Sequence, residues 1–185
     1  WLYPVKTVVV LGLLVYFWPR YDELHTRPVA GANDLWLTLI TGVMVYLGWV
    51  HLDWPWAVHS QTAGYDPYRA GPQLGTALAV IRLFGAAAVV PVMEELFWRS
   101  FLIRYLISPR FESVKLGTLT PFAVAVTLIL FAVEHDRWLA GLMAGAVYTM
   151  LLYWTQRLWP CILAHSLTNL LLGVHVLLTH DWRYW

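Results

Sequence analysis

Six long apolar runs constrain this chain more than any other feature of its sequence. A helix needs roughly 20 mostly apolar residues to cross the hydrocarbon core of a bilayer, and runs close to that length recur along the whole chain. We place the expected spans at 2–18, 35–52, 74–93, 119–134, 138–156 and 159–178. The pattern predicts an all-α, polytopic integral membrane bundle of six to eight membrane helices.

The composition agrees with this class and narrows the expected partners. Of the 185 residues, 59% are hydrophobic and 12% are charged, whereas soluble domains usually contain about 25% charged residues. The net charge of +1 gives no indication of the basic surface that nucleic-acid binding requires. Membrane lipid is therefore the first expected partner. The single cysteine, Cys161, excludes an internal disulfide and a CxxC metal site.

We interpret residues 1–185 as one transmembrane domain with a motif-bearing core at about 74–178. Because the chain begins with Trp1 and not with Met, we expect that some N-terminal sequence has been trimmed. A shorter apolar helix is expected at about 94–107, after Pro91. It could continue the preceding span through a kink at the proline, or form a separate helix in the membrane.

Charged side chains inside apolar spans cost about 2.5–3.5 kcal/mol on insertion scales and are therefore candidates for function. The first group is Glu94, Glu95 and Arg99, in the stretch PVMEELFWRS. Residues four apart share a helix face, so Glu95 can pair with Arg99. Glu94 points about 100° away, has no local partner and could serve as a general base. The alternative is a structural ion pair beside a solvated glutamate.

Two further groups lie in other apolar segments. His135 ends the run that contains Phe131, where a histidine could equally lie at the membrane interface. His165 and Asn169 project from one face of the last span, and the alternative is a hydrogen-bonded pair between helices. A carboxylate and a histidine can polarise a water molecule, and a histidine and an asparagine can stabilise an oxyanion. Together these groups provide what amide hydrolysis requires without a covalent nucleophile.

The three motifs EExxxR, FxxxH and HxxxN, in this order and in apolar helices, resemble those of a known family of intramembrane proteases. It is the type II CAAX prenyl endopeptidase and bacteriocin-processing family (CPBP, or Abi-type). The stretches EELFWRSFLIRYL, EHDRWLAGLMAG and LAHSLTNLLLG resemble most closely its bacterial branch associated with exosortase (PEP-CTERM) protein sorting. The resemblance implies a multi-pass endopeptidase of the cell inner membrane. Its expected partners are a protein or peptide substrate and protein-sorting machinery.

The resemblance also implies roles for individual residues. The implied catalytic set is Glu94 as general base, His135 as its partner in activating water, and His165 with Asn169 as the oxyanion site. The implied site-shaping residues are Glu95, Arg99 and Phe131. No cofactor is expected. The alternative is a zinc-dependent version of the same protease, whose ligands would be Glu94, His135 and His165, although the chain lacks an HExxH motif.

The expected spans contain one geometric conflict. If 119–134 and 138–156 are separate full spans, His135 lies at one membrane face and His165 near the other. The two can meet only if a span is tilted or broken, or if the HDRW link after the fourth span is sunk into the protein, where it could line a water-filled cavity. The alternatives from other function classes are a non-catalytic scaffold of a sorting system and a proton-relaying transporter. The transporter alternative is the weaker of the two, because the sequence does not contain the inverted repeats that many transporters have.

Overall fold

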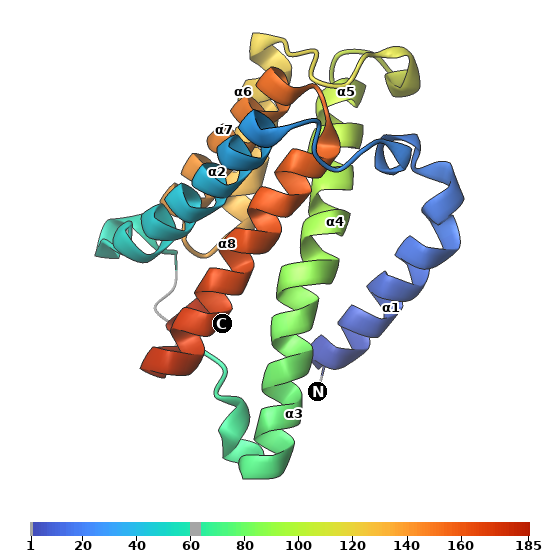
Figure 1. The fold of residues 1–185 in the computed structure, drawn as a ribbon. Helices are drawn as coiled ribbons and strands as arrows, with labels where there is room; N and C mark the ends of the chain where they lie inside the picture. The colour runs from blue at the N-terminus through green and yellow to red at the C-terminus, as the bar shows by residue number, and fades with distance from the viewer. Residues whose placement is uncertain (1, 60–63) are drawn as a thin grey trace.

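The computed structural model describes residues 2–59 and 64–185, and every regular element among them is a helix. The α-helices are α1 (Leu2–Phe17), α2 (Ala32–His51), α3 (Pro72–Phe84), α4 (Val90–Glu95), α5 (Ile103–Tyr105), α6 (Pro121–Glu134), α7 (Trp138–Thr155) and α8 (Leu158–Thr179). Short 3-10 turns lie in the connections: η1 (Trp18–Arg20), η2 (Asp22–His25), η3 (Pro55–Ala57), η4 (Pro67–Ala70), η7 (Phe111–Ser113) and η8 (Trp182–Tyr184). The predicted all-α class is confirmed (Figure 1).

Among the described residues, five helical segments are long and apolar enough to cross a membrane. They are Leu2–Arg20, Ala32–His51, Pro72–Tyr105, Trp138–Thr155 and Leu158–Thr179. The expected span at 119–134 differs, because α6 has only 14 residues and would extend about 21 Å, less than the roughly 30 Å of hydrocarbon in a bilayer. The chain is therefore a polytopic helical membrane protein in which α6 is too short to cross on its own.

The elements α3, α4 and α5 form one continuous helix of 34 residues. The helix expected at 94–107 is thus a continuation of the span at 74–93 and not a separate helix. Two π-helical stretches, η5 (Gly85–Val89) and η6 (Leu96–Leu102), interrupt it. In η5 the backbone N–H of Val90 donates to the carbonyl of Gly85, five residues back. The wider turn accommodates Pro91, which has no N–H and whose ring would clash with the preceding turn of a regular helix.

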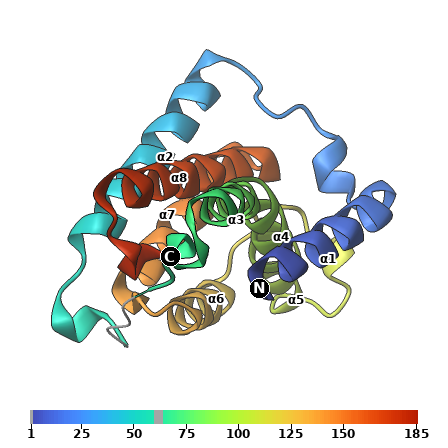
Figure 2. The same ribbon diagram turned by 90° about the horizontal axis from the view of Figure 1, so that it is seen from below.

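The long helix divides the bundle. On one side α8 packs against α2 and α7, and α6 packs against α7. On the other side α1 lies against the long helix, away from α2 and α7 (Figure 2). Small residues permit the closest approaches. A Cβ atom on Gly42 of α2 would lie 2.7 Å from the carbonyl oxygen of Ala164, and one on Gly145 of α7 would lie 3.2 Å from the ring of Phe131.

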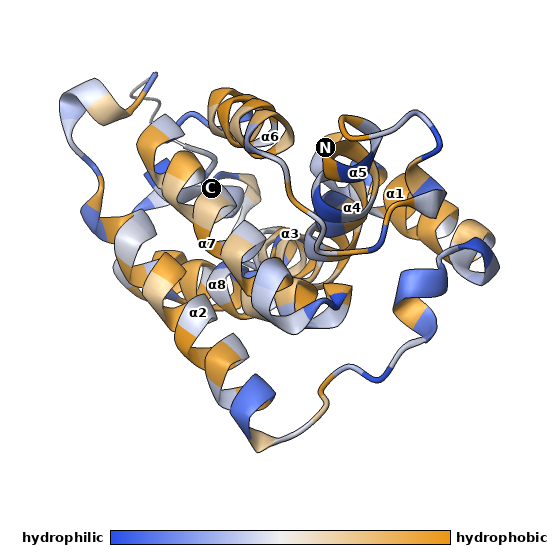
Figure 3. Cartoon of the chain, turned by 90° about the horizontal axis from the view of Figure 1, so that it is seen from above, coloured by the Kyte–Doolittle hydropathy of each residue, from blue (hydrophilic) through white to orange (hydrophobic). Residues whose placement is uncertain are grey.

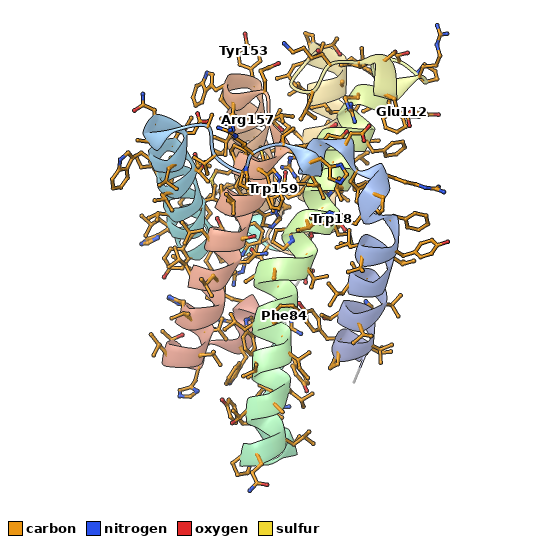
Figure 4. The ribbon with its side chains drawn as sticks, turned by 45° about the vertical axis from the view of Figure 1, so that its right-hand side comes forward. Trp18, Phe84, Glu112, Tyr153, Arg157 and Trp159 are labelled. Carbon is orange, nitrogen blue, oxygen red and sulfur yellow. The ribbon has the colours of Figure 1, made fainter. Side chains whose placement is uncertain are left out.

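The surface of the bundle is an apolar belt with polar ends. Figure 3 shows hydrophobic colour along most of the helices and hydrophilic colour in the connections and at α4 and α5. In Figure 4, Glu112 and Arg157 lie at one end of the bundle, and Trp18 and Trp159 lie just inside it. Amphipathic tryptophan rings settle at lipid headgroups. Phe84, half exposed on the long helix, lies further along the belt (Figure 4).

One polar contact fixes the connection between α1 and α2 to the long helix. Glu23 of η2 accepts a hydrogen bond from the Ser100 hydroxyl at 2.6 Å and forms an ion pair with Arg104. Burial raises the pKa of Glu23, but hydrogen bonds from Ser100 and Arg104 and the charge of Arg104 outweigh it, so the pKa lies below its ordinary value. Nearby, the Trp159 indole donates to the carbonyl of Leu24 at 3.0 Å.

Candidate active site

Four polar side chains from three parts of the fold line one cavity of about 320 Å³. They are Glu94 on α4, His135 directly after α6, and His165 and Asn169 on α8. Phe131 lines the same cavity. The structure therefore brings together the four residues for which the sequence suggested a catalytic role.

Glu95 lies behind the cavity wall and organises two of its neighbours. Its side chain is 0% exposed, and its Oε1 atom accepts hydrogen bonds from Arg99 at 3.2 Å and from His165 Nδ1 at 2.9 Å. The predicted pair between Glu95 and Arg99 is confirmed. The contact between Glu95 and His165 cannot be predicted from the sequence, because the two residues are 70 positions apart in the chain and no local spacing indicates it.

Arg99 connects the long helix to α6 and α7. Its guanidinium is fully buried, donates to the carbonyl of Gly145 at 3.4 Å and lies 4.5 Å from the ring centroid of Phe131 and 5.5 Å from that of Tyr148. A cation over aromatic faces gains electrostatic stabilisation. The arginine thus pairs with Glu95 and packs against the ring of Phe131 at the cavity wall.

Glu94 has a different environment from Glu95. Its Oε2 atom is buried and has no hydrogen-bond partner among the described residues, and no described lysine, arginine or histidine lies within ion-pair distance of it. Buried polar atoms are nearly always hydrogen-bonded to protein or water. The Glu94 side chain lines the cavity, so its carboxylate can accept a hydrogen bond from a water molecule there.

His135 is held with one ring nitrogen committed to the backbone. Its Nδ1 atom lies 2.7 Å from the carbonyl oxygen of Phe131, which requires the proton on Nδ1 and leaves the lone pair of the neutral ring on Nε2. The ring packs between Trp49, at 5.3 Å between centroids, and Phe131, at 4.6 Å. The imidazole is thereby fixed in tautomer and in orientation.

Asn169 is oriented by the break in the long helix. Its amide Nδ2 donates to the carbonyl of Ala86 at 2.8 Å. In η5 the N–H of Val90 goes to Gly85, and the next residue, Pro91, has no N–H to offer. The carbonyl of Ala86 therefore has no helical donor from either residue, and the side chain of Asn169 supplies one.

His135 and His165, which the sequence placed near opposite membrane faces, line one cavity in the structure. Arg137 is buried and forms an ion pair with Asp53, and the carbonyl of Asp136 accepts from the N–H of His59 at 2.7 Å. Asp53 and His59 thus contact the link, although Asp136 within it is exposed. Because α6 stops after 14 residues, His135 reaches the same cavity as His165.

Two wall residues escaped the sequence analysis. The ring of Tyr148 stacks on His165 at 5.1 Å between centroids, and its hydroxyl donates to Thr168 at 2.8 Å. Thr168 in turn donates to the carbonyl of Gly42 at 2.8 Å. Thr168 lies inside the HxxxN motif, but nothing in the sequence pairs it with a tyrosine of α7. These contacts add a second constraint on the His165 ring.

The residues proposed for a zinc-dependent alternative do not form a ready ligand set. No three histidine, cysteine, aspartate or glutamate side chains among residues 2–59 and 64–185 are placed to hold one metal ion. Glu94, His135 and His165 share the cavity, but a catalytic zinc usually needs three protein ligands at about 2 Å. The donor set therefore does not fit a zinc ion in this geometry.

Comparison with known proteins identifies a family. The family described as Rce1-like, type II CAAX prenyl endopeptidase Rce1-like, matches residues 76–171, which is just over half of the 185 residues. The matched region contains Glu94, His135, His165 and Asn169. No curated protein matches the chain, and no solved structure matches it.

Proposed function

The chain belongs to the type II CAAX prenyl endopeptidase Rce1-like family, and from this premise we propose that it is an intramembrane endopeptidase that hydrolyses a peptide bond with water activated by Glu94. The family supports a membrane protein with peptide hydrolase activity. The observation that supports the mechanism is a cavity lined by Glu94, whose carboxylate has an oxygen without a protein partner among the described residues, together with His135, His165 and Asn169.

Glu94 and His135 prepare the nucleophile in this proposal. A water molecule donates one hydrogen bond to Glu94 and the other to Nε2 of His135, whose proton is held on Nδ1 by the carbonyl of Phe131. Glu94 removes a proton as the water oxygen attacks the scissile carbonyl carbon. It then returns that proton to the leaving amine when the C–N bond breaks. Both proton transfers involve the same carboxylate.

His165 and Asn169 stabilise the negative charge that develops on the carbonyl oxygen. The amide of Asn169 has two N–H groups, one bound to Ala86 and one left for the oxyanion. His165 donates from Nδ1 to Glu95, so it can donate from Nε2 only as an imidazolium. Glu95 is the buried carboxylate that stabilises that charge. Removing one oxyanion donor from a hydrolase typically lowers kcat by roughly 10²–10³.

The test uses the purified protein in lipid nanodiscs and a library of synthetic ten-residue peptides, with cleavage followed by mass spectrometry. We expect the wild type to cleave members of the library and Glu94→Gln to lose at least about 10²-fold in rate, because the amide keeps the shape but cannot accept the proton. Glu112→Gln is the matched control, since Glu112 is exposed in a connection. Full activity in Glu94→Gln would refute the assignment. An inactive wild type would favour the non-catalytic scaffold.

The branch and the location belong to the same proposal. The stretches around the three motifs support a bacterial relative that resides in the cell inner membrane and acts on a sorting or maturation substrate. Fractionation of the native cells should place the protein in the inner membrane. Deletion of its gene should leave the uncleaved precursor of a sorted protein in the cell. Recovery of the protein in another membrane would contradict this part of the proposal.

A further inference from the structure

We propose that Arg82 binds a carboxylate group of the substrate, about five residues along the peptide from the bond that is cleaved. The inference rests on the proposed peptidase function and assigns to the same cavity a second, anion-binding end. Arg82 belongs to α3 and lines the cavity together with Glu94. It is part of none of the three sequence motifs and has no role in the proposed hydrolysis.

The surroundings of Arg82 are aromatic. Its guanidinium carbon lies 4.6 Å from the ring centroid of Tyr3, 5.5 Å from that of Trp185 and 5.7 Å from that of Tyr65. Cation–π contacts stabilise a half-buried guanidinium, but they leave its N–H groups free to donate. Three rings thus hold the cation at the wall without neutralising its charge.

Arg82 differs in this respect from the other arginines that are removed from solvent. The buried or half-buried arginines with a carboxylate partner are Arg99, Arg104, Arg137 and Arg157. Arg82 is half-buried, and no carboxylate of the described residues lies within ion-pair distance of it. An uncompensated charge in a low-dielectric wall is unfavourable, so the counter-charge comes from outside the chain.

The chemistry of the site selects a carboxylate. The guanidinium fork binds planar carboxylates through two parallel hydrogen bonds, and the cavity is open to the peptide that Glu94 would act on. Arg82 and Glu94 are twelve residues apart on one continuous helix, which separates them by roughly 16–18 Å along its axis. An extended peptide covers about 3.3–3.6 Å per residue. The carboxylate therefore lies about five residues from the cleaved bond.

Two sources could supply this carboxylate, the free carboxyl terminus of the substrate and an acidic side chain. The experiment separates them with three ten-residue libraries incubated with the protein in phosphatidylcholine nanodiscs. One library has free carboxyl termini and no acidic side chains. The second is its amidated twin, and the third is amidated and carries a single glutamate at varied positions. For each peptide, mass spectrometry gives the distance between the cleaved bond and the carboxylate.

We expect the wild type to cleave about five residues from the carboxylate, whether this belongs to the free terminus, to the glutamate or to both. In the amidated library without acidic residues, the cleavage sites should show no such preference. In Arg82→Gln the KM for carboxylate peptides should rise roughly tenfold to a hundredfold, the loss expected for charge-assisted hydrogen bonds, with kcat little changed. Arg82→Lys should recover part of the effect. Arg110→Gln is the control, since Arg110 is exposed outside the cavity.

A binding measurement keeps the inference testable apart from catalysis. Glu94→Gln protein is titrated with a fluorescent ten-residue carboxylate peptide and with its amidated twin, with and without Arg82→Gln. Tighter binding of the carboxylate peptide that disappears with Arg82→Gln supports the proposal even if no library peptide is cleaved. Equal binding of the two peptides overturns it, whether or not the wild type is a peptidase. Competition by phosphatidylglycerol without any carboxylate preference would assign the anion to lipid phosphate and also overturn it.

Discussion

Replacing Arg99 by alanine should destabilise the fold more than any single change at the surface. Arg99 and Glu95 are both 0% exposed, and the change leaves the Glu95 carboxylate with His165 as its remaining hydrogen-bond partner. Breaking a buried ion pair by removing one partner costs about 3–5 kcal/mol. Loss of the contacts with the two aromatic rings adds roughly 0.5–2 kcal/mol. We therefore expect a loss of about 3.5–7 kcal/mol in the free energy of unfolding.

The measurement is equilibrium unfolding in mixed detergent micelles, followed by tryptophan fluorescence, for a double-mutant cycle. Glu95→Gln alone should also be strongly destabilising, because it strands the guanidinium. The double variant Glu95→Gln with Arg99→Met should be more stable than the sum of the single changes implies, since no buried charge is left unpaired. Arg183→Ala, in an exposed pair with Asp181, is the control and should cost at most about 1 kcal/mol.

Two results would refute this reasoning. If Arg99→Ala unfolds within about 0.5 kcal/mol of the wild type, Arg99 does not compensate a buried charge. If the two single changes add to the value of the double variant within about 0.5 kcal/mol, Glu95 and Arg99 act independently and the ion pair contributes nothing specific.

Three further predictions concern the helix break, the end of the bundle and metal dependence. Pro91→Ala should keep or raise stability, since proline is unfavourable in a helix interior. It should nevertheless lower kcat roughly tenfold, because a backbone N–H at position 91 would compete with Asn169 for the carbonyl of Ala86. A kcat equal to that of the wild type would contradict the role of η5. The pKa of Glu23 in the folded protein lies below its ordinary value of 4.5, so Glu23 stabilises the fold above pH 4.5, and this stabilisation is lost as the pH falls through the folded pKa. Glu23→Gln should therefore make the free energy of unfolding depend less on pH in the acid range. An unchanged pH dependence would count against the contact. Chelator-treated protein should retain peptidase activity. The zinc-dependent alternative would be correct if elemental analysis found stoichiometric zinc and if activity were lost on its removal and restored on its return.

The sequence predicted most of the fold because its dominant signal is one-dimensional. Apolar runs of span length set five helices, and the i, i+4 spacing of Glu95 and Arg99 set their ion pair. The run predicted at 119–134 matches α6 (Pro121–Glu134) to within two residues, but counting it as a full span was wrong, because a helix of this length is too short to cross a bilayer on its own. The relation of 94–107 to its neighbour depended on how a helix absorbs a proline, which the sequence left open.

The site was predictable in its members but not in its contacts. Spacing identified residues on shared helix faces, such as His165 and Asn169. Contacts between helices have no such signature, and the bond from His165 to Glu95 therefore appears only in three dimensions. The same holds for Arg82, whose significance comes from the carboxylate it lacks and from rings contributed by α1 and the carboxyl-terminal residues.

The π-helical stretch η5 also sets the angular phase between the two halves of the long helix. A regular helix turns about 100° per residue, so twelve steps would place Arg82 and Glu94 about 120° apart around the axis. A π-bulge inserts one extra residue without adding the 100° that a residue of a regular helix contributes. The angle between Arg82 and Glu94 around the helix axis is thereby reduced to about 20°, and both side chains line one cavity. A change that regularises the helix swings Arg82 out of register with Glu94, and deleting one alanine from Ala86–Ala88 in the same chain turns it back. Relatives without a proline at this position should therefore have one residue fewer between the two sites.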